Sequence, residues 1–256
     1  MTTIAVAETA LTLGLLRLAD TALVHAQRLS EWCGHAPMLE EDLALANIAL
    51  DLIGQARALY AYAAEVEGAG RSEDDLAYLR DAPQFRNVLM AELPKGDFAF
   101  TILRGFLLAA QARPFWQAAS GSRDATLAAI AAKAEKEAAY HLRHTGEWVI
   151  RLGDGTAESR RRMLNALAAL WPYTGELFET DAADRALIEE GILPDPAALR
   201  PHWDATVDRV FAEAGLVRPA DVWLQSGGRS GRHTEHLGHL LAVMQHLQRA
   251  YPGATW

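Results

Sequence analysis

The sequence predicts an all-α fold, an antiparallel bundle of long helices with additional short ones, in a single domain spanning residues 1–256. Alanine and leucine dominate, and β-branched residues are sparse. Long stretches carry apolar residues at helical spacing. The Asp-Gly pair at 154–155 follows a helix instead of separating two alternating runs, so no hairpin is indicated. Several expected helices exceed 20 residues and have short connections, which favours antiparallel neighbours.

Helix-breaking and capping residues divide the chain into six long helices. Gly34 and Pro37 separate the first helix from the second. Ser122, with Arg123 and Asp124 after it, can cap the fourth helix, and Gly153 ends that helix. Thr156 can cap the fifth, with Glu158 adding negative charge to its first turn. The six expected ranges are 8–32, 38–66, 97–118, 123–152, 156–178 and 231–250.

Shorter helices are expected near 73–92, 183–191 and 197–214. Ser72 and Asp75 form a variant of the capping box at the start of the first of them. The segments 193–201 and 226–232 are rich in proline or glycine. The composition does not shift across them, however, so they are read as connectors within one domain.

Composition excludes several classes of protein. Half of the residues are hydrophobic and 22% are charged, so the chain can bury a substantial core. The lone cysteine, Cys33, excludes an intrachain disulfide and cysteine-based metal sites, and fits a cytoplasmic location. The sequence contains no run of about 18 apolar residues, the length that would predict a membrane span. The net charge of −9 argues against a nucleic-acid binder.

A stripe of polar residues runs along the expected helix 38–66. Asn47, Asp51 and Gln55 recur at helical spacing beside the apolar stripe. One interpretation is a solvated face. The other is a polar network across the bundle, in which Asp51 pairs with a cation on another helix, because a buried aspartate without a partner is unfavourable.

The expected helix 123–152 carries a second polar group. Glu137, His141 and His144 lie on the same side as Ile130 and Ala134, which suggests that this side faces inward. Because Glu137 and His141 are four residues apart, the carboxylate could hold the imidazole in one tautomer. A histidine on such a face is more often a satisfied core or interface residue than a metal ligand.

The last expected helix is rich in histidine. His233, His236 and His239 recur every three residues, and Glu235 shares a face with His239. Carboxylate and imidazole groups can bind zinc or iron. Three-residue spacing drifts around a helix, however, so the three histidines converge poorly on one ion. A polar interface is the favoured interpretation.

The connector SGGRSGR, residues 226–232, precedes that helix. Its backbone amides, with Arg229 or Arg232, could hold a small anion such as a phosphate. The alternative interpretation is a flexible connector.

The spacing required for a di-iron site is absent. Such bundles use a glutamate on each of two helices and Glu-x-x-His on each of two others. None of the nine histidines follows an acid by three residues. His141 has Ala138 at that position, and Asp51 is followed by Gly54 where the histidine would stand. Helix 97–118 has no acid after Asp97. A standard di-iron site cannot be assembled from these residues.

Four segments together resemble a known family: RLSEWCGHAPMLEEDLALANIALDLIGQAR (28–57), EKEAAYHLRHTGEWVIRLGDGT (135–156), ALWPYTGELF (169–178) and HTEHLGHLLAVMQHLQR (233–249). They resemble the structural C subunits of bacterial multicomponent ring-1,2-phenylacetyl-CoA epoxidases. The resemblance implies a ferritin-like bundle that pairs with a di-iron catalytic A subunit. With a reductase subunit that uses NADPH, and the other subunits, the complex epoxidises phenylacetyl-CoA.

In that family the C subunit does not carry the working iron centre. The resemblance therefore implies a chain without catalytic, cofactor or metal residues, in which Asp51, Gly54, Ala138 and His141 are degenerate di-iron positions. It also suggests that helices 8–32 and 38–66, with Trp32 and the turn 33–40, contact the A subunit. Arg229 and Arg232 could then contact the coenzyme A tail.

Three alternatives remain open at the level of the sequence. A metal-binding helical-bundle oxidoreductase or hydrolase could use Glu137 and His141 with Glu235 and His239. A hydrolase or cofactor-free oxygenase could use Glu137 and His141 alone as a base pair. A helical adaptor could act without any oxygenase partner.

Overall fold

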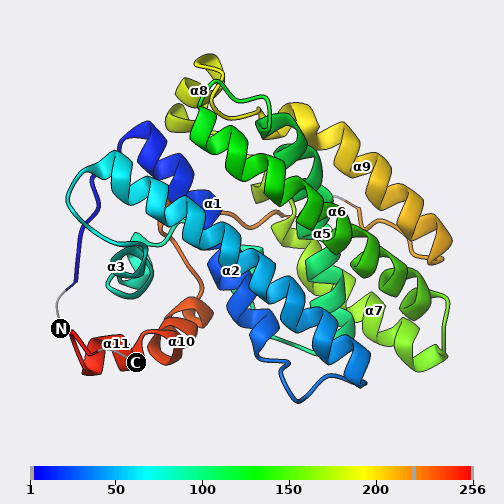
Figure 1. The fold of residues 1–256 in the computed structure, drawn as a ribbon. Helices are drawn as coiled ribbons and strands as arrows, with labels where there is room; N and C mark the ends of the chain where they lie inside the picture. The colour runs from blue at the N-terminus through cyan, green and yellow to red at the C-terminus, as the bar shows by residue number, and fades with distance from the viewer. Residues whose placement is uncertain (1–2, 221–222, 255–256) are drawn as a thin grey trace.

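The computed structural model describes residues 3–220 and 223–254. Within them every regular element is helical, so the predicted all-α fold is confirmed (Figure 1). Four long helices form the central bundle, in which α1 pairs with α2, α5 pairs with α6, and α2 contacts α6. These helices are α1 (Ala10–Ser30), α2 (Leu39–Glu67), α5 (Phe98–Ala119) and α6 (Ala125–Gly153). Each lies within two residues of its predicted limits at both ends.

Side-chain caps set the starts of these helices. Asp97 accepts a hydrogen bond from the backbone N–H of Phe100 at 2.9 Å and begins α5. Asp124, rather than Ser122, is the cap of α6 and accepts from Leu127 N–H at 2.9 Å. Ser122 accepts from the Asp124 N–H at 3.1 Å, so it supports the cap. The two caps start the helices that supply one half of the bundle.

Three outer helices cover the bundle. α7 (Ala157–Leu170) and α9 (Pro196–Glu213) pack on α5 and α6, whereas α8 (Ala182–Glu189) packs on α1. The predicted range 156–178 is too long for one helix. Its regular part ends at Leu170, and two 3₁₀ turns follow, because Pro172 lacks the N–H that would continue the α-helical hydrogen bonds.

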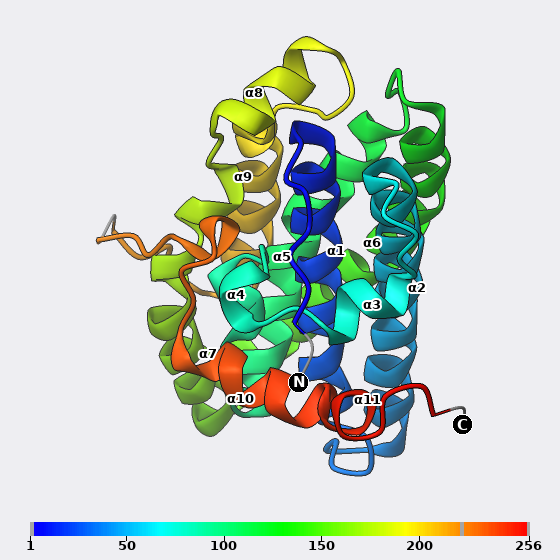
Figure 2. The ribbon, with the colours of Figure 1, turned by 90° about the vertical axis from the view of Figure 1, so that its left-hand side faces the viewer.

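The prediction of one helix near 73–92 is also wrong. The segment contains α3 (Glu73–Tyr78), a 3₁₀ turn around Pro83 and the single-turn helix α4 (Leu89–Glu92). The C-terminal segment forms α10 (Glu235–Met244) and α11 (His246–Ala250), starting four residues later than predicted. α10 lies across α4 on the outside of the bundle (Figure 2).

A buried ion pair ties α1 to the segment after α3. Asp20 is fully buried, and its carboxylate accepts hydrogen bonds from the Arg80 guanidinium, the Tyr60 hydroxyl and the Arg86 backbone N–H. Burial disfavours the charge of Arg80, but Asp20 raises its pKa above the usual value. The guanidinium also lies 4.4 Å from the ring centre of Phe85. These residues are called the Asp20 cluster below.

A second buried carboxylate holds the C-terminal segment. Glu92 is fully buried and accepts from the side chains of Asn87, His233 and Thr234 and from the Thr234 backbone N–H. The other ring nitrogen of His233 lies 2.9 Å from the carbonyl oxygen of Phe85. Both ring nitrogens therefore face acceptors, a geometry that only the protonated imidazole satisfies fully. These residues are called the Glu92 cluster.

Candidate functional site

Two of the predicted degenerate di-iron positions, Asp51 and His141, meet at the contact between α2 and α6. The imidazole Nε2 of His141 lies 3.0 Å from Oδ2 of Asp51. The His141 side chain is 7% exposed and that of Asp51 is 36% exposed, so the pair spans from the interior to the edge of the bundle. A partner for Asp51 on another helix is thus confirmed, although the aspartate itself is only half-buried.

The partner of Asp51 is an imidazole that favours its neutral form. Burial lowers the pKa of His141 below its usual value, and this effect outweighs the opposing hydrogen bond from Asp51. The neutral ring can donate its Nε2 proton to the carboxylate, so the contact is a hydrogen bond across the bundle. A cationic partner for Asp51 stays a prediction.

Glu137 has partners other than His141. It accepts a hydrogen bond from the amide of Gln55 at 2.9 Å, and the ammonium of Lys133 lies 3.4 Å from its other oxygen. Since Asp51 takes the hydrogen bond of His141, the predicted role of Glu137 in holding the imidazole tautomer is wrong. Glu137 and His141 lie on neighbouring turns of α6, but each forms its hydrogen bond with a residue of α2, namely Gln55 and Asp51.

The remaining positions of a di-iron site carry no ligand. Ala138 is 2% exposed in the core. A Cβ added to Gly54 would come no closer than 3.9 Å to another atom, that atom being Nζ of Lys133. Among the described residues, no group of three or more His, Cys, Asp or Glu side chains could hold a metal ion. The residues present therefore do not fit a di-iron centre.

His144 and the residues of α10 stand apart from this pair. The Nε2 atom of His144 lies 3.1 Å from a carboxylate oxygen of Glu41, a close contact without hydrogen-bond geometry. Glu235 and His239 are exposed on α10, which packs against α4. They do not join the α2–α6 contact, and the predicted combination of these residues with Glu137 and His141 is wrong.

The connector at 226–232 does use its backbone amides to bind an anion, but the anion is internal. One oxygen of the buried Glu176 carboxylate accepts from the N–H groups of Gly227 and Arg229, at 3.0 and 3.3 Å. A Cβ on Gly228 would lie 2.3 Å from the carbonyl oxygen of Asn87, so glycine is required by close packing there. The loop is thus a packed part of the fold.

The two arginines of this connector differ. The Arg229 guanidinium donates to Asp184 at 2.7 Å, whereas Arg232 is exposed. A contact of either residue with coenzyme A stays a prediction.

Sequence reasoning missed the Asp20 and Glu92 clusters. Each acid stands alone within an apolar run of the chain, LRLADTALV for Asp20 and VLMAELP for Glu92. An isolated acid in such a run indicates a buried carboxylate that needs partners. That signal was available, whereas the identity of the partners was not.

Comparison with known proteins agrees with the helical bundle. The family model described as phenylacetic acid catabolic protein matches residues 1–256. The chain belongs to this family. Its members are ferritin-like helical bundles, the predicted architecture. Across the described residues of this member, no helix has both the length and the apolar character to cross a membrane.

One relative is similar to this chain along nearly the whole length of both proteins. It is the C subunit of the 1,2-phenylacetyl-CoA epoxidase of Escherichia coli (strain K12), which is 52% identical over 246 residues. The match covers 96% of this chain and 99% of the relative. The resemblance recognised from four segments therefore extends through the intervening ones.

Proposed function

We propose that this chain is the non-catalytic structural subunit of a 1,2-phenylacetyl-CoA epoxidase complex in aerobic phenylacetate degradation. The observation that carries the proposal is the Asp51–His141 hydrogen bond, which links α2 and α6 with Gly54 and Ala138 at the adjoining ligand positions. The 52% identity with the C subunit of such an enzyme supports the assignment to this kind of complex. The di-iron centre then belongs to the catalytic A subunit, and the electrons of NADPH enter through the reductase subunit.

The chain's role in the complex is to hold the catalytic subunit in its working shape. Oxygen activation needs reacting groups held in fixed geometry in a site from which water is excluded. A large permanent interface can fix one side of a helical bundle. Because His141 and Asp51 bond to each other across the bundle, this subunit maintains its own helix spacing without a metal.

The outer face of α2 is the surface proposed to contact the A subunit. Leu39, Leu43 and Leu50 lie on one face of the helix and are 71%, 57% and 64% exposed. An exposed apolar stripe of this kind marks an interaction surface. Trp32 does not belong to it, because its side chain is 8% exposed and its Nε1 donates to Thr101 at 2.9 Å. This corrects the expected contribution of Trp32.

The interface is tested by placing charges on this stripe. We expect the double variant Leu43→Glu/Leu50→Glu, co-expressed with a tagged A subunit, to co-purify at least tenfold less well, about 1.4 kcal/mol or more of lost binding. Burying unpaired carboxylates in an interface is unfavourable, whereas both side chains face solvent in the free chain. Leu164→Glu on α7, 44% exposed, is the matched control and should leave the yield unchanged. Full co-purification of the double variant would count against the proposed surface.

The non-catalytic role is tested by metal analysis. We expect the chain purified alone from iron-rich cells to hold far less than one iron or zinc atom per molecule, because no described ligand set fits a metal. In the assembled complex, His141→Gln should leave the iron content and the turnover unchanged. Two metal ions per isolated chain, or loss of iron from the complex in this variant, would overturn the proposal.

A further inference from the structure

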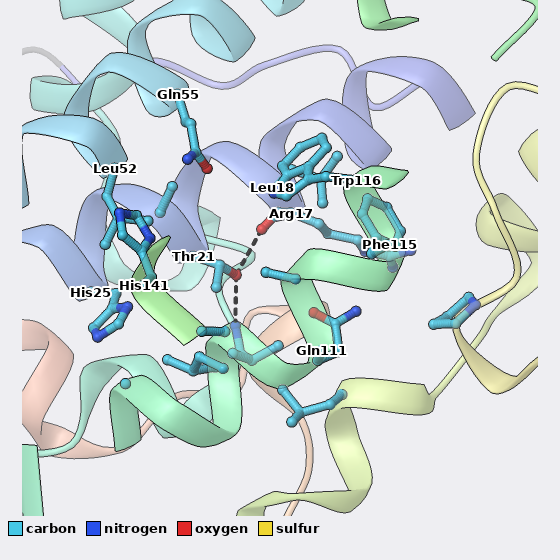
Figure 3. A pocket seen from close by; sticks show the side chains of 18 of the residues that line it. Arg17, Leu18, Thr21, His25, Leu52, Gln55, Gln111, Phe115, Trp116 and His141 are labelled. Atoms are coloured by element: carbon cyan, nitrogen blue, oxygen red, sulfur yellow. Dashed lines mark hydrogen bonds between the residues drawn. The ribbon is translucent and has the colours of Figure 1, made fainter. Parts of the chain in front are cut away.

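The bundle contains an interior cavity of about 140 Å³. It lies between the central helices, and Figure 3 shows Leu18, Leu52 and Phe115 around it, with His25 and His141 toward one end. Every residue of its wall is buried or half-buried, and the cavity has an opening toward solvent.

Two small residues on α5 keep this space open. Ala109 and Ala112 lie about one turn apart on the face of α5 that lines the cavity, whereas a Cβ on Gly105 would lie 3.1 Å from the methyl group of Thr145. Larger apolar side chains would fill the volume, as they do elsewhere in the core. An empty cavity deprives its wall of packing contacts and is unfavourable for the folded state. A ligand that occupies the cavity would restore these packing contacts and would explain why the side chains around it are small.

The charged groups of the wall are already neutralised by one another. The guanidinium groups of Arg17 and Arg229 both donate to Asp184, at 2.9 and 2.7 Å, and Arg17 also pairs with Asp181, so two cations face two carboxylates. Neither end of the cavity therefore offers a free charge. An anionic or cationic ligand would enter an apolar interior without a counter-ion, at a large loss of hydration.

Most neutral polar groups of the wall are also satisfied within the protein. The hydroxyl of Thr21 donates to the carbonyl oxygen of Arg17 at 2.8 Å and accepts from a backbone N–H (Figure 3). Gln55 donates to Glu137, and Thr145 donates to the carbonyl oxygen of His141. Two groups are exceptions among the described residues: the Nε2 atom of His25 has no hydrogen-bond partner, and the amide of Gln111, which also lines the cavity, forms no hydrogen bond (Figure 3).

His25 adds no charge to the cavity. Burial lowers its pKa well below the usual value, and the nearby Arg104 acts in the same direction. The imidazole is thus neutral and offers at most one hydrogen bond. The remaining surface of the cavity is largely aliphatic and aromatic.

We propose that this cavity binds a small, uncharged, apolar molecule no larger than a single aromatic ring. Its volume is close to that of an engineered apolar cavity of about 150 Å³ in another protein, which stays dry and takes up benzene or xenon. The apolar wall with its paired charges gives selectivity against charged molecules, and His25 and the amide of Gln111 can meet a hydrogen-bonding substituent. The cavity reaches His141 and Gln55 of the α2–α6 contact, needs no metal there, and is separate from the exposed face of α2.

Benzene and benzoate, which share a ring but differ in charge, test the proposal on the full-length chain. We expect benzene to raise the melting temperature saturably and benzoate at the same concentration to have no such effect. Ala112→Leu should fill the cavity and weaken the apparent benzene affinity at least tenfold. Ala118→Leu, on an exposed position of the same helix, is the matched control and should bind benzene as the unaltered chain does.

Two results would overturn the proposal: no saturable benzene effect on the unaltered chain, or equal benzene affinity in Ala112→Leu and the unaltered chain. If Ala112→Leu fails to fold, Ala109→Val provides a smaller filling substitution on the same face. Xenon-dependent chemical shifts of cavity methyl groups provide an independent readout. Shifts confined to residues that line the cavity support the proposal, and shifts only elsewhere refute it.

Discussion

Replacing Asp20 with asparagine should lower the free energy of unfolding by about 3–5 kcal/mol, as expected when one partner of a buried ion pair is removed. The substitution keeps the size of the side chain, so packing changes little. The guanidinium of Arg80, 1% exposed, would lose its counter-ion in the core. The hydroxyl of Tyr60 and the N–H of Arg86 would also lose a charged acceptor. Urea denaturation followed by circular dichroism measures the change.

The matched control for this prediction is an exposed ion pair. Arg162 contacts Glu158 at 2.8 Å, with both side chains about half exposed. Arg162→Ala should change the free energy of unfolding by less than about 1 kcal/mol, because water screens exposed pairs. A change in Asp20→Asn no larger than in this control would show that the buried pair contributes little net stability.

Replacing Glu92 with glutamine should have a similarly large effect, about 3–5 kcal/mol, and should also change how stability depends on pH. Glu92 raises the pKa of His233 above its usual value, although burial opposes this. A group whose pKa is higher in the folded state stabilises the fold fully below its unfolded pKa, near 6.5. That contribution is lost as the pH rises through the folded pKa. Glutamine cannot support the imidazolium, so this part of the pH dependence should flatten.

Denaturation measured across this pH range tests the Glu92 prediction. Glu235→Gln is the matched control, since Glu235 is exposed in the first turn of α10, two residues after His233. It should retain both the stability and the pH profile of the unaltered chain. A Glu92→Gln profile parallel to that of the control would refute the role assigned to His233.

Local periodicity was sufficient to predict the bundle helices. The α2 and α6 limits follow from caps, glycines and apolar spacing, all of which act within a few residues. The two errors at 73–92 and 156–178 arose in segments that contain Pro83 and Pro172, each of which lies in a 3₁₀ turn. A proline lacks the N–H needed to continue an α-helix, and this local effect overrides the periodicity there.

The candidate site was predictable only in part. The absence of Glu-x-x-His is visible in the sequence, because that motif is a local spacing. The partner of Asp51 could not be identified, because His141 is 90 residues away and only the packing of α2 on α6 brings them together. The cavity depends on the combined volumes of four helices, which single-helix patterns do not encode.

The Glu92 cluster gives the final part of the chain a role in completing the fold. Two of its donor residues, His233 and Thr234, lie 141 and 142 residues beyond the carboxylate they satisfy. Until that late segment has been synthesised and docked, the Glu92 carboxylate stays hydrated only if water can still reach it. Closing so long a loop carries an entropic penalty that the carboxylate's hydrogen bonds must offset. In a chain truncated before His233, the amide of Asn87 would be the one described side-chain donor left to this buried carboxylate.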